Sequence, residues 1–157
     1  MGKIVNQSWL TALRRGCMSA PARYLMCEGL LVGRILDFGC GYGYDVNALT
    51  KLGYDIVGYD KYHRVGYPSG VFDVVMCNYV LNVVSKGEGK GVEGEIEGLL
   101  VGGGVAYYAV RSDVKGGGYR WSPVYRGWTY QRDVRMALEE IHRGRRYRMY
   151  RYVKGCQ

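Results

Sequence analysis

The sequence predicts an α/β protein whose central sheet is mostly parallel and is covered by helices on both faces. Short apolar runs alternate with segments of helical spacing along the 157 residues, and strands separated by helices are typical of parallel sheets. One of these runs, Arg34–Phe38, leads directly into a glycine-rich loop. The length suits one domain with a genuine core, so we expect a single domain over residues 1–157.

Two helical segments and two strands are expected in the first half of the chain. Apolar spacing predicts helices within residues 7–32, through Trp9, Leu10 and Leu13 and, after Pro21, through Tyr24, Leu25, Leu30 and Leu31. The first strand covers residues 34–38. A helix follows from about Asp45 and ends at Gly53, which can adopt the left-handed conformation of a cap. The second strand covers residues 55–59 and is followed by Asp60.

The second half is expected to add strands at residues 71–77 and 105–110. Five glycines weaken the helix between them, so we expect it to begin late in the segment 85–100, near Val92. Beyond Arg111, the residues up to Trp128 have the composition of a long loop. A helix is then predicted over residues 131–141, from the spacing of Val134, Ala137, Leu138 and Ile141. The final strand is expected over residues 145–154, with Tyr147, Met149 and Val153 on one side.

Composition favours a soluble, cytoplasmic protein. No apolar run approaches the roughly 20 residues of a membrane span, and the first ten residues lack the apolar stretch of a secretory signal. The five cysteines form no C-x-x-C pair, which favours free thiols in a reducing compartment. No metal site is expected, because His63 and His142 show no ligand spacing and are interpreted as ordinary surface or turn residues.

The glycine loop is the strongest functional signal. Asp37-Phe-Gly-Cys-Gly-Tyr-Gly43 places glycines at positions 39, 41 and 43 after a strand-end acid, and glycine allows a ligand to approach the backbone closely. A dinucleotide site favours G-x-G-x-x-G/A, whereas Tyr44 stands at the sixth position here. The spacing therefore argues against a nicotinamide or flavin site. A glycine-rich turn without a ligand is the other alternative.

The loop resembles the first motif of the Rossmann-like methyltransferases that use S-adenosylmethionine. The wider sequence is similar to a small family of methyltransferases associated with DNA phosphorothioation, in separated blocks: MSAPAR from Met18, ILDFGCGYGYDV, GYDKY, NYVLNVV, VR at 110–111 and WTYQ at 128–131. The resemblance implies a Rossmann-like methyltransferase fold with S-adenosylmethionine as cofactor. It also implies that the strand-end acid and the loop amides hold the methionine part, through Asp37, Gly39, Cys40, Gly41 and Gly43.

Asp60 is expected to hold the ribose, next to Lys61 as a further cofactor-binding residue. An acid at the end of the second strand can accept hydrogen bonds from both ribose hydroxyls. Only ten residues separate Asp60 from Val71, too few for a crossover helix and another strand. We therefore expect a reduced sheet without the third strand of the methyltransferase fold. The loop 61–70 would close the adenine side, with Tyr62 or Tyr67 as a stacking surface or as an exposed loop tyrosine.

Asn78 and Tyr79 are the expected catalytic residues, and Asn78 is also expected to contact the cofactor. They follow a buried strand, and ligands bind outside the carboxyl ends of parallel strands. Enzymes that methylate the amino groups of bases carry D/N-P-P-Y/F here, whereas this chain has Asn78-Tyr-Val-Leu81, so only the Asn matches. Asn82 is interpreted as a helix cap or a second substrate contact. Methyl transfer by in-line attack requires mainly positioning, which suits a chain without a catalytic triad.

The charge balance favours a negatively charged partner. Lys and Arg number 22 against 14 Asp and Glu, so the formal net charge is +8. The segment Arg145–Lys154 alternates Arg with Tyr, and Tyr119, Arg120, Trp121, Tyr125, Arg126 and Trp128 precede it. This predicts a nucleic-acid acceptor contacted by Arg146, Arg148 and Arg151, or a terminal strand with an apolar inward side. A non-catalytic accessory protein that binds the cofactor or nucleic acid is the alternative function.

Overall fold

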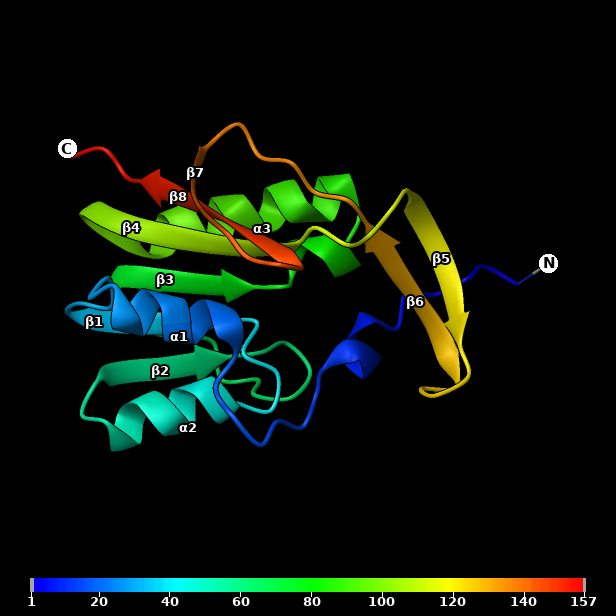
Figure 1. The fold of residues 1–157 in the computed structure, drawn as a ribbon, viewed down its shortest axis with the longest axis horizontal. Coiled ribbons are helices and arrows are strands. Elements are labelled where there is room, and N and C mark those ends of the chain that lie inside the picture. Colours follow the sequence, from blue (N-terminus) through cyan, green and yellow to red (C-terminus); the bar gives the residue numbers. More distant parts are fainter. Residues whose placement is uncertain (1, 157) are drawn as a thin grey trace.

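A six-stranded sheet in the order β2-β1-β3-β4-β8-β7 forms the centre of the molecule (Figure 1). The computed structural model describes residues 2–156. Strands β2, β1, β3 and β4 are parallel, β8 is antiparallel to β4, and β7 is antiparallel to β8. The strands cover Arg34–Phe38 (β1), Asp55–Tyr59 (β2), Phe72–Asn78 (β3), Leu100–Arg111 (β4), Glu139–Arg143 (β7) and Tyr147–Val153 (β8). The predicted mostly parallel sheet is confirmed.

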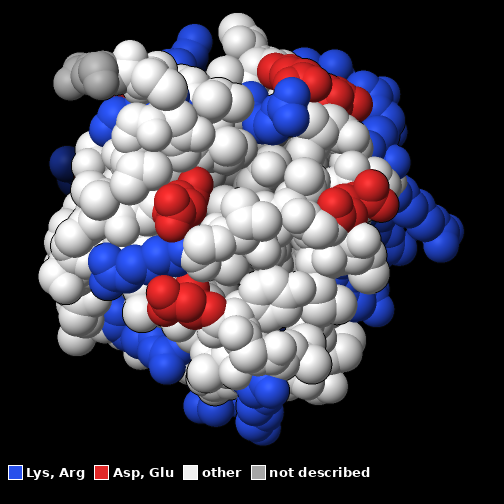
Figure 2. Space-filling view, turned by 90° about the vertical axis from the view of Figure 1, so that its left-hand side faces the viewer, with Lys and Arg blue, Asp and Glu red and all other residues white. Residues whose placement is uncertain are grey.

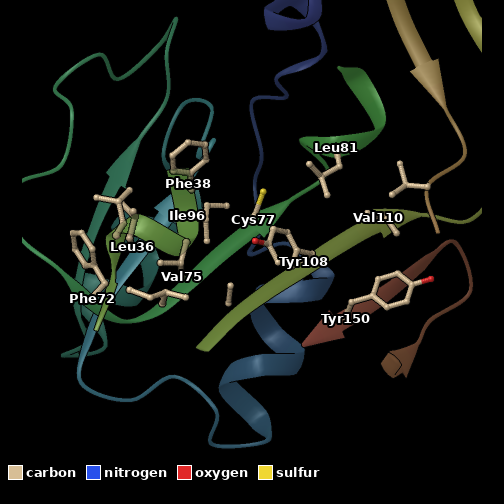
Figure 3. Packing of buried hydrophobic residues seen from close by; sticks show 14 residues of the cluster. Leu36, Phe38, Phe72, Val75, Cys77, Leu81, Ile96, Tyr108, Val110 and Tyr150 are labelled. Carbon is tan, nitrogen blue, oxygen red and sulfur yellow. The ribbon is translucent and has the colours of Figure 1, made fainter. Parts of the chain in front are cut away.

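Helices cover both faces of the sheet, as the sequence predicts. Helices α1 (Ala20–Cys27) and α2 (Tyr44–Lys51) lie on one face and α3 (Lys86–Leu99) on the other. Successive strand residues point to opposite faces, so Leu36 and Phe38 of β1 join the core cluster that contains Ile96 of α3 (Figure 3). Ile35 joins the second cluster, together with Leu25 of α1 and Leu49 of α2. Both apolar layers therefore depend on the alternation within β1.

The sheet ends at β2, and no strand of residues 2–156 lies beyond it. In residues 61–70 the structure has turns and extended backbone, and the one pairing is an isolated bridge between Asp60 and Arg64. The predicted reduced sheet is thus confirmed. The short link brings the chain from β2 across to β3 on the far side of β1.

Helix α3 begins at Lys86, six residues earlier than expected, so the predicted late start is wrong. Ser85 forms a capping box with Glu88: its hydroxyl accepts from the Glu88 amide at 3.2 Å, and the Glu88 carboxylate accepts from the Ser85 amide at 2.8 Å. A capping box satisfies free amides of the first turn. Burial of Ile96 and Leu99 against the sheet stabilises the other end. These tertiary and capping contributions outweigh the glycine penalty of about 1 kcal/mol per residue.

Two expectations for the C-terminal third are wrong. The expected long loop contains a hairpin of β5 (Gly117–Ser122) and β6 (Gly127–Arg132), and residues 131–141 form no helix. Val134 is buried there in irregular backbone, and residues 139–143 form β7 beside β8. Pairing with β7 satisfies the backbone groups along the outer edge of β8, which a helix over these residues would leave unpaired, so strand formation overrides the helical spacing. At the N-terminus, the first expected helix is only the 3₁₀ turn η1 (Ser8–Thr11).

No helix among residues 2–156 is long and apolar enough to cross a membrane. Within the same residues, no three side chains of His, Cys, Asp or Glu gather as a group that could hold a metal ion.

Candidate active site

A cleft of about 430 Å³ lies where the parallel strands end. Its walls come from the ends of β1, β2 and β3, from residues 6–15 of the N-terminal segment, and from the first half of α3. Figure 1 shows the arrows of β2 and β3 pointing toward this side, where the N-terminal segment crosses. The carboxyl ends of parallel strands are the usual binding edge of an open α/β sheet, and the volume suits a small-molecule ligand.

The glycine loop has a backbone that other residues would strain. Gly39, Gly41 and Gly43 have φ of 79°, 57° and 79°. A Cβ at Gly39 would lie 2.3 Å from Cγ2 of Val80, which is too close for real atoms. Glycine is therefore required here because it adopts the left-handed conformation without strain and, at Gly39, allows the close contact with the segment after β3.

The amides of this loop bind within the protein rather than pointing into the cleft. The carbonyl of Tyr59 accepts from Gly39 N (2.7 Å) and Cys40 N (3.0 Å), and Gly41 N donates to Oδ2 of Asp60 (3.0 Å). Three of the amides expected to hold the methionine part of the cofactor therefore already have partners within the protein, and their role in cofactor binding stays a prediction. The bonds instead join the ends of β1 and β2, and the loop offers the cleft a surface without long side chains.

Asp37 is a buried carboxyl with a strongly shifted pKa. Burial, followed by the charges of Asp45 and Asp60, raises its pKa from 3.8 to about 8, although Arg15 and Arg64 oppose the shift. Asp45 itself is held in place, because its two oxygens accept from the backbone amide (2.8 Å) and hydroxyl (2.6 Å) of Ser19, the N-cap residue of α1. At neutral pH, Asp37 is largely protonated until a positive charge comes near.

Asp60 organises the turn that follows β2. Its Oδ1 accepts from Tyr62 N and His63 N, both at 2.9 Å, while Oδ2 accepts from Gly41 N. Each carboxylate oxygen has two acceptor sites, so Oδ2 keeps one acceptor site beyond its bond to Gly41 N. Lys61 also lines the cleft, with its Nζ 5.6 Å from the centre of the Tyr62 ring.

Cys40 is a cleft residue without nucleophilic character. Its thiol is half-buried, and burial together with the neighbouring carboxyls of Asp37 and Asp60 raises its pKa to about 12. The thiol therefore stays protonated at neutral pH. Gly58 lies directly below it, since a Cβ there would be 2.8 Å from the Cys40 sulfur.

Asn78 ends β3 and lines the cleft with unused hydrogen-bonding capacity. Both its side-chain oxygen and nitrogen are buried, and neither has a hydrogen-bond partner among residues 2–156. A buried amide without partners costs about 1–3 kcal/mol. Such a group in a cleft is explained most simply by a ligand that completes its bonds.

Tyr79 follows in a left-handed conformation that tyrosine rarely adopts, with φ of 62°. Its amide donates to the carbonyl of Ala109 at 2.8 Å, which extends the pairing of β3 with β4 by one residue. Burial raises the pKa of its phenol to about 12, so the hydroxyl is a hydrogen-bond donor and not a base at neutral pH. Backbone strain of this kind is typical of functional sites.

Asn82, in contrast, is neither a helix cap nor a substrate contact. Its Oδ1 accepts from Arg111 N at 2.7 Å and its Nδ2 donates to Arg132 O at 2.9 Å. It lies in η2 (Leu81–Val83) and is fully buried. Asn82 therefore links η2 to β4 and β6 as a structural residue, so both sequence interpretations of it are wrong.

His63 and Trp9 are among the cleft residues that sequence reasoning missed. His63, expected to be an ordinary surface or turn residue, lines the cleft, and its Nε2 lies 3.0 Å from the carbonyl of Trp9. The Trp9 ring packs on Tyr62 with centroids 4.8 Å apart. Tyr67 packs edge-on against Tyr59 at 5.2 Å instead. The loop 61–70 and the N-terminal segment thus close one side together, which no local pattern could indicate.

Two of the three arginines expected to contact phosphates form ion pairs within the protein. Arg148 is buried and forms an ion pair with Asp133 (Nη1–Oδ1, 3.7 Å), and Arg151 pairs with Glu139 (Nε–Oε2, 2.9 Å). Only Arg146, just before the strand, is exposed. Arg148 is not available to a phosphate because β8 lies inside the sheet, between β4 and β7, with both faces covered over residues 147–150. Nucleic-acid binding by this segment stays a prediction.

Comparisons with known proteins agree with the expected fold. Residues 11–86, which include the glycine loop, Asp60 and Asn78, match a family model described as a methyltransferase domain. None of the curated proteins matches the chain. The narrower family associated with DNA phosphorothioation is not among the matches and stays a prediction.

Several solved structures are similar in fold. The 1,6-didemethyltoxoflavin-N1-methyltransferase of Burkholderia thailandensis, with bound S-adenosylhomocysteine, is 14% identical at a TM-score of 0.60, covering 87% of this chain and 77% of that one. Magnesium protoporphyrin IX methyltransferase of Synechocystis PCC 6803, with the same ligand, is 16% identical at 0.56, covering 87% and 81%. The DhpI complex with S-adenosylhomocysteine is 15% identical at 0.59, covering 88% and 85%. The chain therefore has the class I methyltransferase fold.

Proposed function

We propose that this protein is an S-adenosylmethionine-dependent methyltransferase that uses the cleft for the cofactor and for the acceptor group. The observation that carries the proposal is the glycine loop between two strand-end carboxyls, Asp37 and Asp60, beside the unpartnered amide of Asn78. The matching methyltransferase domain covers these same residues. A dinucleotide site is disfavoured, because the third glycine of its motif is absent at Tyr44.

The charge of the cleft suits a cationic cofactor. Five acidic side chains line it against two basic ones, Arg15 and Lys61; the acids are Asp37, Asp45, Asp60, Glu88 and Glu95. S-adenosylmethionine supplies a methyl group on a positively charged sulfur and also carries an ammonium group. Asp37 would face these charges, and their presence would favour its ionised form.

Asp60 and the Trp9–Tyr62 pair would hold the nucleoside part. Asp60 already accepts three amide bonds, so it is fixed in position for further bonds from ribose hydroxyls. Tyr62 is the better candidate than Tyr67 for stacking on adenine, because it lines the cleft and packs on Trp9.

Asn78 and Tyr79 would position the acceptor. The Asn78 amide can both donate and accept, while the Tyr79 hydroxyl keeps its proton and donates. Neither group is a strong base, so their contribution is orientation of the attacking atom in line with the methyl group. Well-oriented reactants can supply about 7–11 kcal/mol of a barrier.

We further propose that the acceptor is a nucleic acid, on the support of the formal net charge of +8. A small-molecule acceptor is the competing outcome, because the similar structures bear the names of enzymes for a toxoflavin precursor and a porphyrin.

The first experiment measures cofactor binding by calorimetry with S-adenosylmethionine, S-adenosylhomocysteine and NAD. Asp60→Ala should weaken both adenosyl ligands at least tenfold, since it removes every bond that Asp60 makes to the loop and the ribose. Asp55→Ala is the matched control, because Asp55 is an exposed acid at the opposite end of β2. Tight NAD binding without heat from the adenosyl ligands would contradict the proposal.

The second experiment follows radiolabelled methyl groups from the cofactor into pools of DNA, RNA and small molecules. Asn78→Ala should abolish labelling because it alters acceptor placement, and any loss of affinity for S-adenosylhomocysteine measures the further contact expected between Asn78 and the cofactor. Cofactor binding with no label in any pool would instead support the non-catalytic accessory protein.

A further inference from the structure

The hairpin β5–β6 carries four aromatic rings on one face. The antiparallel register places Tyr119 opposite Tyr130 and Trp121 opposite Trp128, and alternate residues of a strand share a face. Both pairs meet edge to face, with ring centroids 5.3 Å and 5.8 Å apart. We call these four residues the aromatic ladder.

The ladder faces solvent. Trp121, Tyr119 and Trp128 are 52%, 44% and 38% exposed. The opposite face of the hairpin is packed on the N-terminal segment: Thr129 is buried, and a Cβ at Gly127 would lie 2.5 Å from Cδ1 of Leu10. The cross-strand pairs stabilise the hairpin, but that role does not require two tryptophans to be open to water.

All charged residues in the segment that contains the ladder are basic. Residues 114–132 contain Lys115, Arg120, Arg126 and Arg132 and no Asp or Glu. Lys115, Arg120 and Arg126 are exposed, and none of them forms an ion pair with a described residue. This differs from the face at the amino ends of the parallel strands, where acidic and basic residues are scattered together (Figure 2).

The ladder is continuous with the rim of the cleft. Arg132, on the same face of β6 as Trp128 and Tyr130, donates through Nε to the carbonyl of Val84 at 2.9 Å. Asn6 accepts from Tyr130 N at 3.1 Å and donates to Val83 O at 2.7 Å. Asn6, Val83 and Val84 all line the cleft.

We infer that the aromatic ladder binds single-stranded nucleic acid and leads it to the cleft. Exposed rings stack on unpaired bases of any sequence. The long side chains of the three exposed cations in the same segment contact the phosphates, although Arg120 starts from the opposite face of the hairpin. A duplex keeps its bases stacked inside and cannot use the rings in this way. The claim that the bound nucleic acid continues into the cleft rests on the proposed function, because it makes this nucleic acid the methyl acceptor.

Fluorescence anisotropy with labelled 20-nucleotide strands tests the inference on protein saturated with S-adenosylhomocysteine. The probes are single-stranded DNA, single-stranded RNA and duplex DNA of one sequence, at 50 and 200 mM NaCl. We expect tighter binding of the single strands and a loss of about twentyfold between the two salt concentrations, for three phosphate contacts. The DNA and RNA arms decide which strand is preferred.

Two variants distinguish the contribution of the aromatic rings from that of the basic side chains. Trp121→Ala should weaken single-strand binding five- to a hundredfold by loss of base stacking. Arg120→Glu/Arg126→Glu keeps every ring and should weaken binding at least tenfold. Arg23→Glu/Lys51→Glu changes the net charge equally at two exposed cations on α1 and α2, neither of them paired with a described acid, and should have an effect below threefold. Quenching of tryptophan fluorescence by the unlabelled strand should persist in Trp9→Phe and fall in Trp121→Phe/Trp128→Phe.

The inference would be overturned by equal losses of binding in the matched control or by binding that salt does not alter. Binding of duplex as tight as that of single strands, or no binding at all, would also overturn it. Calorimetry of S-adenosylhomocysteine on the same proteins keeps the two proposals apart. Cofactor binding without strand binding leaves the methyltransferase standing and removes the ladder's role. Binding of the nucleic acid without binding of the cofactor would support the ladder's role and contradict the proposed methyltransferase activity.

Discussion

The cleft and the hairpin are neighbours with opposite charge. The cleft is lined by five acids and two basic residues. The segment 114–132 exposes aromatic rings and carries four basic residues and no acid. Asn6 and Arg132 join the two regions by hydrogen bonds.

This difference would allow one small domain to accommodate the two ligands proposed for it, a cationic cofactor and a nucleic-acid strand. A cationic cofactor is attracted by carboxylates, whereas a polyanionic strand is repelled by them. The acids lie in the cleft and the arginines lie on the hairpin. This arrangement separates the negative electrostatic potential from the positive one. The two regions also differ in support, because the cleft rests on a six-stranded sheet and the hairpin is a two-stranded one, which is marginal alone.

The largest expected effect concerns the glycine loop that forms the cleft. Gly39→Ala forces a Cβ to within 2.3 Å of Val80, in addition to the strain of a left-handed alanine. We expect a loss of about 3 kcal/mol or more in the free energy of unfolding and no measurable binding of S-adenosylhomocysteine. Urea unfolding and calorimetry measure the two effects.

Gly53→Ala is the matched control for that variant. Gly53 has φ of 92° but no atom within 4 Å of its Cβ position, so it tests strain without the clash. It should cost about 1–2 kcal/mol and leave cofactor affinity unchanged. Equal costs for the two variants would show that the contact with Val80 is unimportant.

Asn78 and Asn82 provide the second test, since one amide is unpartnered and the other is satisfied. Asn82→Ala leaves Arg111 N and Arg132 O without their bonds and should destabilise the protein by about 2–3 kcal/mol. Asn78→Ala should leave stability unchanged or raise it slightly. Thermal unfolding of both variants decides, and a destabilised Asn78→Ala would mean that its amide has a structural role.

The third test uses the shifted pKa of Asp37. Unfolded Asp37 ionises above about 3.8 and folded Asp37 above about 8, so folding takes up a proton between these values. The contribution of Asp37 to stability therefore falls as pH rises through that window. A cationic ligand favours the ionised form, so its affinity should rise with pH, by at most tenfold per unit, up to pH 8.

Calorimetry of S-adenosylmethionine, whose sulfur is positively charged, at pH 6, 7 and 8 in two buffers of different ionisation enthalpy measures the released proton. Asp37→Asn should bind with no such pH dependence. Proton uptake instead of release would mean that the ligand prefers the neutral carboxyl.

The smallest expected effect lies in the hairpin. A double-mutant cycle of Trp121→Ala and Trp128→Ala should give a coupling energy of about 0.5–1.5 kcal/mol, from chemical denaturation followed by circular dichroism. Cofactor affinity should not change, because neither ring lines the cleft. A coupling well above this range would make the ladder a structural element of the whole domain.

Much of the first half of the protein could be predicted from local patterns. The glycine spacing, the acid after β2 and the ten-residue link to β3 predicted the loop, Asp60 and the missing strand. Each of these depends on residues close in sequence, where backbone conformation and chain length leave few alternatives. The cleft residues Trp9 and His63 were missed, because their contact joins segments 54 positions apart.

The C-terminal third shows the opposite case. Val134, Ala137, Leu138 and Ile141 have helical spacing, yet the chain pairs residues 139–143 with β8. Arg148 belongs to a basic, alternating segment, yet it is buried beside Asp133.

The sequence by itself determined the α/β class, the reduced sheet and the position of two acids and one amide at the ends of the first three strands. Those features follow from periodicity, glycine conformation and the reach of ten residues, all of which act locally. Only the tertiary structure decided that β8 is an inner strand, that its arginines are paired, and that the exposed aromatic rings belong to the hairpin. The physical reason is that burial and strand pairing depend on which distant segments meet, and their energies exceed the local preferences of the residues involved.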